Sequence, residues 1–253
     1  GAVVEEATYR TGLAAAAVDA GFVDAALDAS DRASLLWEHL GRRAQWAYSL
    51  LAKASALAIV GSKMDSQFCA ELARQRANDA GDRRAEAYAL MALFDLSSAE
   101  SDESRRLISS VESLIDTQDN ADDQVRTCSR KLLCGLLTDE AVCAHDCLVR
   151  SEHLSPTTCL EWWSARCVVA LRSRSSLGRE DDLVGKVIRC LREAAPVSVR
   201  GPAIAAAKQL AMRIGDGDSV RSLSIAQQRL SSVVFSHTPA QFLAGAQAAS
   251  WLD

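Results

Sequence analysis

The chain has 253 residues and a formal net charge of -5, and 49% of it is hydrophobic although only 5% is aromatic. A net negative molecule repels phosphate backbones and anionic membrane surfaces, which argues against direct binding to nucleic acid or membranes. No apolar run reaches the ~18 residues that a membrane span needs, and the N-terminal residues lack the basic and apolar parts of a secretion signal. We therefore expect a cytoplasmic location.

Alanine and leucine abound, while glycine (13) and proline (4) are few. This composition suits closely packed helices better than a sheet, which favours β-branched and aromatic residues, so we predict an all-α fold. The eight cysteines stand mostly inside apolar helical patterns, where a free thiol behaves as a small hydrophobe. We expect them to be reduced.

Helical patterns follow one another in pairs from the start of the chain. "VVEEATYRTGLAAAAVD" and "FVDAALDASDRASLLWEHL" predict a first pair over residues 1–40, with weaker apolar stripes than the later pairs. Residues 42–60 are broadly apolar, as expected of a helix covered on several sides. The helix that follows carries a single stripe of Met64, Phe68 and Leu72.

The same alternation continues along the chain. Helices apolar on several sides are predicted over 82–99, 121–137, 155–174 and 198–214. Each of these is followed by a helix with a single apolar stripe. In chain order, the four stripes include Ile108 and Val111; Ala141, His145 and Leu148; Val184 and Val187; and Leu223 and Leu230. Ser155 and Pro156 suit a cap and a first helical position. "SHTPAQ" predicts the start of a closing helix.

The broadly apolar helices start near 42, 82, 121, 155, 198 and 237, at intervals of 34 to 43 residues. A helix between neighbours, followed by a helix that covers one flank, is the repeating unit of a helical solenoid. We predict about six antiparallel helix pairs plus the closing helix, in a single domain over residues 1–253.

"AEAYALMALFDLSSAESDESRRLISSVESLI" resembles a tetratricopeptide repeat, with Tyr88, Met91 and Ala92 at the aromatic, aliphatic and small positions of the first helix. Ser104, Ile108 and Val111 match the second helix loosely, the closing proline is absent, and the period exceeds the common ~34 residues. The resemblance implies a right-handed superhelix whose first helices line a concave face.

"ARQRANDAGDRRAEAYALMAL" is also similar to the repeat segments of large LuxR-type bacterial transcription regulators. In that family the segment is a sensor that binds an inducer or a regulatory protein. Residues 40–120 carry this likeness, and the remainder shares only the periodicity. Repeats of this appearance also build eukaryotic scaffolds such as separase and the anaphase-promoting complex, so both settings stay open. "IVGSKM" lacks the glycine spacing of a phosphate-binding loop.

Six of the eight cysteines lie between 128 and 167, together with His145 and His153. Cys143 and Cys147 are one helical turn apart, so the two sulfurs have the spacing to share a metal, with Cys134 near them across the hairpin. The alternative, which we favour, places all of these cysteines in apolar stripes. Spacing alone does not support a catalytic Cys/His pair, which is defined by its geometry in space. The acidic pairs at helix starts are expected to cap the helices and to interact favourably with the helix dipole. We expect neither a cofactor nor catalytic activity.

Charge is unevenly distributed. The five broadly apolar helices from 42 to 214 contain 14 Lys and Arg against 6 Asp and Glu. We predict a basic groove that binds an acidic peptide segment of a partner protein, or a small anionic effector. The alternative is that these residues only solvate helix ends. Trp162 and Trp163 are adjacent, so one is expected in the core and the other at the groove. The predicted contact residues are Arg43, Arg84, Tyr88, Arg126, Arg130, Trp162, Arg166 and Lys208.

Overall fold

The computed structural model describes residues 1–98, 101–115, 120–151, 154–172, 180–193 and 197–234. These residues form twelve helices and no strand, which confirms the all-α prediction for the described part of the chain. No helix there combines the length and the apolarity that crossing a membrane requires. The predicted closing helix after "SHTPAQ" lies outside the described residues.

The helices fall into two compact units, residues 1–116 and 117–253. The first unit contains α1 (Ala2–Ala20), α2 (Val23–His39), α3 (Arg43–Ile59), α4 (Lys63–Ala80), α5 (Arg83–Leu96) and α6 (Asp102–Leu114). The second contains α7 (Ala121–Leu133), α8 (Asp139–Ser151), α9 (Pro156–Arg172), α10 (Glu180–Leu191), α11 (Val197–Ile214) and α12 (Gly217–Val234). These bounds lie close to the predicted ones.

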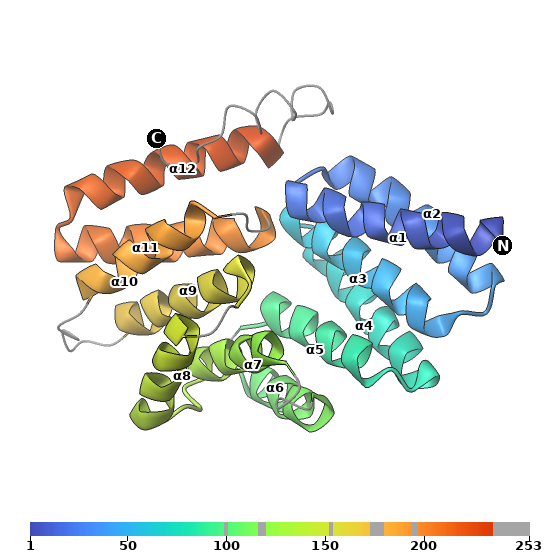
Figure 1. The fold of residues 1–253 in the computed structure, drawn as a ribbon, viewed down its shortest axis with the longest axis horizontal. Helices are drawn as coiled ribbons and strands as arrows, with labels where there is room; N and C mark the ends of the chain where they lie inside the picture. The colour runs from blue at the N-terminus through green and yellow to red at the C-terminus, as the bar shows by residue number, and fades with distance from the viewer. Residues whose placement is uncertain (99–100, 116–119, 152–153, 173–179, 194–196, 235–253) are drawn as a thin grey trace. The chain divides into compact units, whose positions relative to one another are not determined.

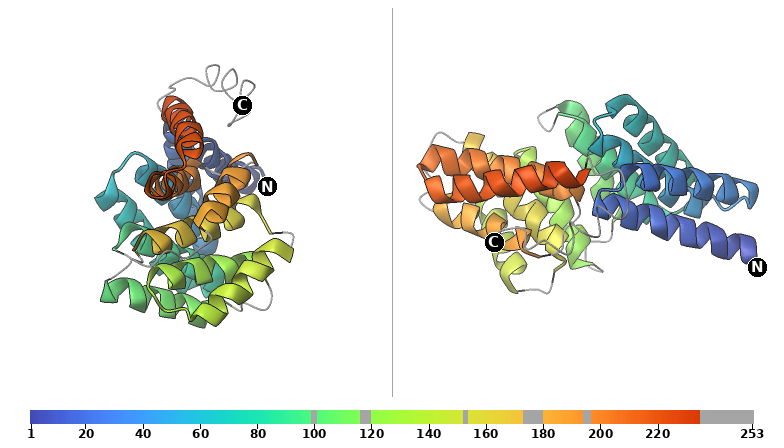
Figure 2. Two further views of the ribbon diagram at one scale, coloured as in Figure 1. Left: turned by 90° about the vertical axis from the view of Figure 1, so that its left-hand side faces the viewer. Right: turned by 90° about the horizontal axis from the view of Figure 1, so that it is seen from above.

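In the first unit, each helix packs on the next along the chain (Figure 1). The central helix α3 contacts α1 and α5 as well as α2 and α4. In the second unit, α9 contacts α7, α10 and α11. Helices α11 and α12 lie side by side in all three views (Figures 1 and 2).

Four glycines at 20-residue intervals lie in the turns that follow α1, α2, α3 and α4. Gly21, Gly41, Gly61 and Gly81 all have positive φ, between 64° and 84°. At each turn the glycine N–H bonds back into the helix, and so does the N–H of the next residue, as when Ser62 N donates to Leu57 O over 3.0 Å. This is the Schellman end of a helix. Because the next helix begins two residues after each glycine, consecutive helices reverse direction, and alternate helices run parallel.

The same device ends α7 earlier than the sequence pattern suggests. Gly135 has a φ of 68°, and the N–H of Leu136 donates to Lys131 O over 2.9 Å. The predicted helix over 121–137 therefore stops at Leu133, and Leu136 is exposed. Apolar residues continue in the sequence past Gly135, but the helical backbone of α7 ends at Leu133.

Alanine dominates the core of the first unit, and this corrects the stripe predicted for residues 64–72. The side chains of Met64 and Phe68 are 76% and 69% exposed. The buried face of α4 consists of Ser66, Cys69, Ala70, Ala73 and Ala77. Small side chains let neighbouring helices approach closely, so the larger apolar residues were directed outward. The second unit has a core of larger side chains, among them Leu160, Trp162, Leu191, Ile204, Leu210 and Leu223.

Candidate partner-binding site

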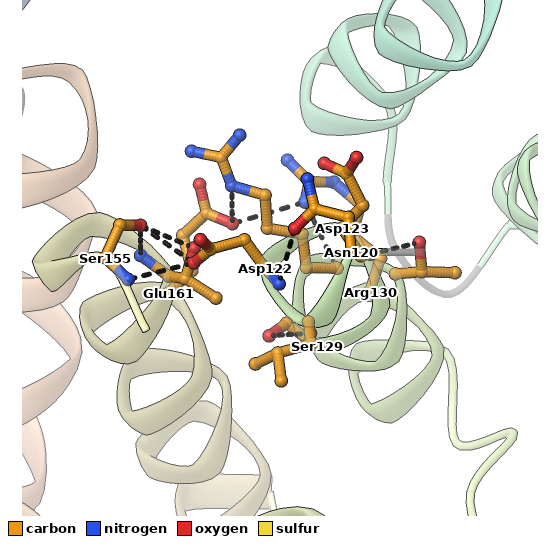
Figure 3. A network of polar contacts seen from close by, with 11 residues as sticks. Asn120, Asp122, Asp123, Ser129, Arg130, Ser155 and Glu161 are labelled. Carbon is orange, nitrogen blue, oxygen red and sulfur yellow. Dashed lines mark hydrogen bonds and ion pairs between the residues drawn. The ribbon is translucent and has the colours of Figure 1, made fainter. Parts of the chain in front are cut away.

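Polar contacts join the starts of α7 and α9 in the second unit (Figure 3). Asn120 caps α7, its side chain accepting from the N–H of Asp122 over 3.0 Å. Asp122 in turn accepts from both the backbone N–H and the hydroxyl of Ser155, each over 3.0 Å. The Ser155 hydroxyl lies 2.8 Å from that of Thr158. Asp122, the first acid of the pair at this helix start, thus bonds to the start of the neighbouring helix α9.

These contacts set the charge state of Asp122. Partial burial raises the pKa of its carboxyl, but hydrogen bonds from Thr158 and Ser155 and the positive charge of Arg126 lower it by more. The pKa of Asp122 therefore lies below its ordinary value. The ionised form is the one that holds α7 and α9 together.

Two of the predicted contact residues meet an acidic residue within the chain. Glu161 of α9 lies 3.4 Å from Nη1 of Arg130 on α7 (Figure 3). It also lies 3.7 Å from Nε of Arg126, on the same helix. The side chain of Arg130 is only 11% exposed, and its guanidinium also donates to Arg126 O. Glu161 offsets part of the positive charge that the sequence assigned to a groove.

A second ion pair fixes α8 on α9. Asp146 of α8 accepts from Trp162 Nε1 over 2.9 Å, and its other oxygen lies 3.4 Å from Arg166 Nη2. Trp162 has no exposed surface, and its ring lies 5.5 Å from that of His145. The predicted role of Trp162 as a surface contact does not fit this burial. Trp163 is also buried, so neither tryptophan borders a groove.

Other basic residues bond to helix ends. This agrees with the alternative interpretation, in which the basic residues lie at helix ends and do not form a groove. Arg172, at the end of α9, donates to Leu133 O at the end of α7 over 2.7 Å. Arg213, near the end of α11, donates to Ala170 O at the end of α9 over the same distance. Lys208 differs from these arginines, because it lies within α11 and donates to the Gln227 side chain of α12 over 3.1 Å. Arginines thus supply donors to the last carbonyls of the neighbouring parallel helix.

The remaining predicted residues are in the first unit, near the starts of two parallel helices. Arg43 is the first residue of α3 and is exposed. Arg84 in the first turn of α5 is exposed too; its Nε donates to the hydroxyl of Tyr88 over 2.9 Å, and its guanidinium carbon lies 5.5 Å from the centre of that ring. Since α3 and α5 contact each other and run parallel, these starts lie at the same end of the unit. We call Arg43, Arg84 and Tyr88 the basic face.

The cysteines divide into two groups. Cys143 and Cys147 are exposed, whereas the other six are buried or half-buried. The prediction that all cysteines of the 128–167 region face apolar stripes is therefore wrong for these two. No set of three or more His, Cys, Asp and Glu side chains gathers as a metal site in the described part of the chain. His153 lies outside it.

Burial governs the reactivity of the inner thiols. Desolvation raises the pKa of Cys167 to about 12, and desolvation with nearby Cys159 and Glu193 raises the pKa of Cys190 to about 12 as well. Both thiols are protonated at neutral pH, and a protonated thiol is a poor nucleophile.

Reasoning from sequence missed Glu161 and Asp146, the acids that pair with the predicted arginines. Glu161 is the single acidic residue of α9, which was a signal available in the sequence. Its partners on α7 depend on how two helices about 30 residues apart are aligned, and sequence spacing does not give that alignment.

No protein-family model, no curated protein and no solved structure matches this chain. The resemblance to tetratricopeptide and LuxR-type repeats accordingly stays a prediction.

Proposed function

We propose that the chain is a non-enzymatic binding module of stacked helical hairpins, part of a larger signalling or transcription regulator, that recognises an acidic segment of a partner protein. Its support is the packing order within each unit: α3 contacts α1 and α5, and α9 contacts α7 and α11. Stacked hairpins present a row of first helices, each supplying a few side chains to a partner. Such prearranged side chains lower the entropy cost of binding.

The observation that carries the choice of partner is the exposure of Arg43 and Arg84 at the starts of neighbouring parallel helices. By contrast, Arg126, Arg130 and Arg166 face Glu161 or Asp146. The proposed contact surface is therefore the basic face alone. Tyr88 adds an aromatic ring beside Arg84, and tyrosine and arginine are common anchors in protein interfaces.

A displayed library of random peptides, selected against the whole chain, tests this function. We expect enrichment of peptides rich in Asp and Glu, with affinity that falls as salt is raised. The double substitution Arg43→Glu/Arg84→Glu should lower the affinity for the selected peptides by more than about tenfold, because two charges that attract the peptide become repulsive.

The matched control is Arg105→Glu/Arg106→Glu, which makes the same change of charge at two exposed positions of α6. It should leave binding within about twofold, because distant exposed charges are screened. Selected peptides without an acidic bias, or equal losses in the two double variants, would remove the basic face from the proposal.

A further inference from the structure

Helix α8 carries two exposed thiols that the proposed function does not use. Cys143 and Cys147 lie four residues apart on this 13-residue helix, and both are exposed. Residues with this spacing are neighbours on one face of a helix, one turn apart. The two thiols are thus a paired feature of the surface.

The helix geometry restricts what this pair can do. Side chains at i and i+4 have Cβ atoms about 5–6 Å apart. A disulfide needs a Cβ separation of about 3.5–4.5 Å, so an intact helix keeps these two sulfurs from bonding directly to each other. The separation instead leaves room for one atom between the two sulfurs.

The number of protein ligands determines which metal ion this pair can bind. Within the described residues, no third His, Cys, Asp or Glu completes a cluster with this pair. Structural zinc takes four ligands in a tetrahedron, which two thiolates do not supply. Soft thiolate ligands favour Cu(I) among the available metal ions, and a monovalent d¹⁰ ion of that kind is satisfied by two sulfurs in a line.

We propose that Cys143 and Cys147 form a two-thiolate site for a soft monovalent cation, Cu(I) or an ion of the same chemistry. On binding, each thiol loses its proton to solvent and two S–Cu bonds form, so the site changes from neutral to a net charge of -1 with no change of oxidation state. The exposed carboxylates of Asp139 and Glu140, one turn before Cys143, attract the incoming cation. The site lies in the second unit and does not depend on the basic face.

The test is a titration of the reduced chain with Cu(I) under nitrogen, against a coloured Cu(I) chelator of known affinity. We expect one equivalent of copper to be held in competition with the chelator, and X-ray absorption to show sulfur ligands alone. Cys143→Ser and Cys147→Ser should each weaken binding by more than about 100-fold, since even the loss of a group that only supports a ligand costs about 10- to 100-fold.

The control is Cys69→Ser, which removes a buried thiol in the first unit and should leave the affinity unchanged. Circular dichroism verifies that every variant keeps its helical content. Complete transfer of copper from the wild-type chain to the chelator would overturn the proposal. So would equal affinity in the Cys143→Ser/Cys147→Ser double variant.

Discussion

Asp146 joins two helices through both of its carboxylate oxygens, one receiving Trp162 Nε1 and the other facing Arg166. We predict that Asp146→Ala lowers the free energy of unfolding by about 1–3 kcal/mol, because it leaves the buried indole N–H without an acceptor. Urea denaturation measures the change. The control is Glu140→Ala at an exposed position of the same helix, which we expect to change stability by less than about 0.5 kcal/mol. Equal effects would mean that the indole contact contributes no stability.

Asp122 predicts a dependence of stability on pH. Its pKa is lower in the folded chain, so its contribution is present above the ordinary carboxyl pKa of about 3.9 and is lost as pH falls through the folded value. Below pH about 5, the unfolding free energy of wild type should decrease with falling pH more steeply than that of Asp122→Asn. Urea denaturation at several pH values measures both slopes. If Asp122→Asn retains the wild-type slope, the α7–α9 contact does not respond to ionisation of Asp122.

At the scale of residues, the sequence identified basic side chains but not their partners. Arg126 and Arg166 stand at predictable positions on helices, yet their pairing with Glu161 and Asp146 depends on how helices far apart in sequence lie against each other. Arg43 and Arg84 stand at helix starts and are exposed, although Arg84 also donates to the hydroxyl of Tyr88. The prediction of exposed charge therefore remains applicable at those two positions.

At the scale of elements, a glycine with positive φ follows each of the first four helices, at 20-residue intervals. We predict that Gly61→Ala lowers the unfolding free energy by about 1–2 kcal/mol, the cost of the left-handed conformation for a residue with a Cβ. No atom lies within 4 Å of the added Cβ, so steric contact adds nothing. Gly12→Ala, inside α1 and equally open, should instead stabilise the chain by about 0.4–1 kcal/mol. Chemical denaturation compares the two variants, and destabilisation by both would contradict the conformational explanation.

The positions of the helices could be predicted from apolar periodicity and from polar breaks such as "VGSK" and "AGDR". The end of α7 and the buried face of α4 could not. In α4, Met64 and Phe68 form a stripe as regular as that of Ala70, Ala73 and Ala77, and hydrophobicity alone favours the larger residues. The close approach of neighbouring helices selected the alanines. That approach is a property of the packed unit and not of the single helix.

At the scale of the whole molecule, the net charge is -5, yet basic residues are concentrated in the broadly apolar helices predicted between residues 42 and 214. Part of this basic charge is offset by acids within the second unit, and part supplies hydrogen bonds to helix ends. The basic face of the first unit is exposed at Arg43 and Arg84, and it is the surface that we propose for a partner. The prediction of one continuous array of helix pairs over residues 1–253 stays a prediction. What the structure shows is two units of packed helices, with α3 against α1 and α5 in the first and α9 against α7 and α11 in the second.

The most direct test of the proposed binding surface is hydrogen exchange of the whole chain with and without a selected acidic peptide. The account predicts slower exchange of backbone amides at the starts of α3 and α5, around residues 43–48 and 84–88, with no comparable change along α2, α4 or α6. Slower exchange along α2, α4 or α6, or slower exchange confined to residues 117–253, would contradict this account.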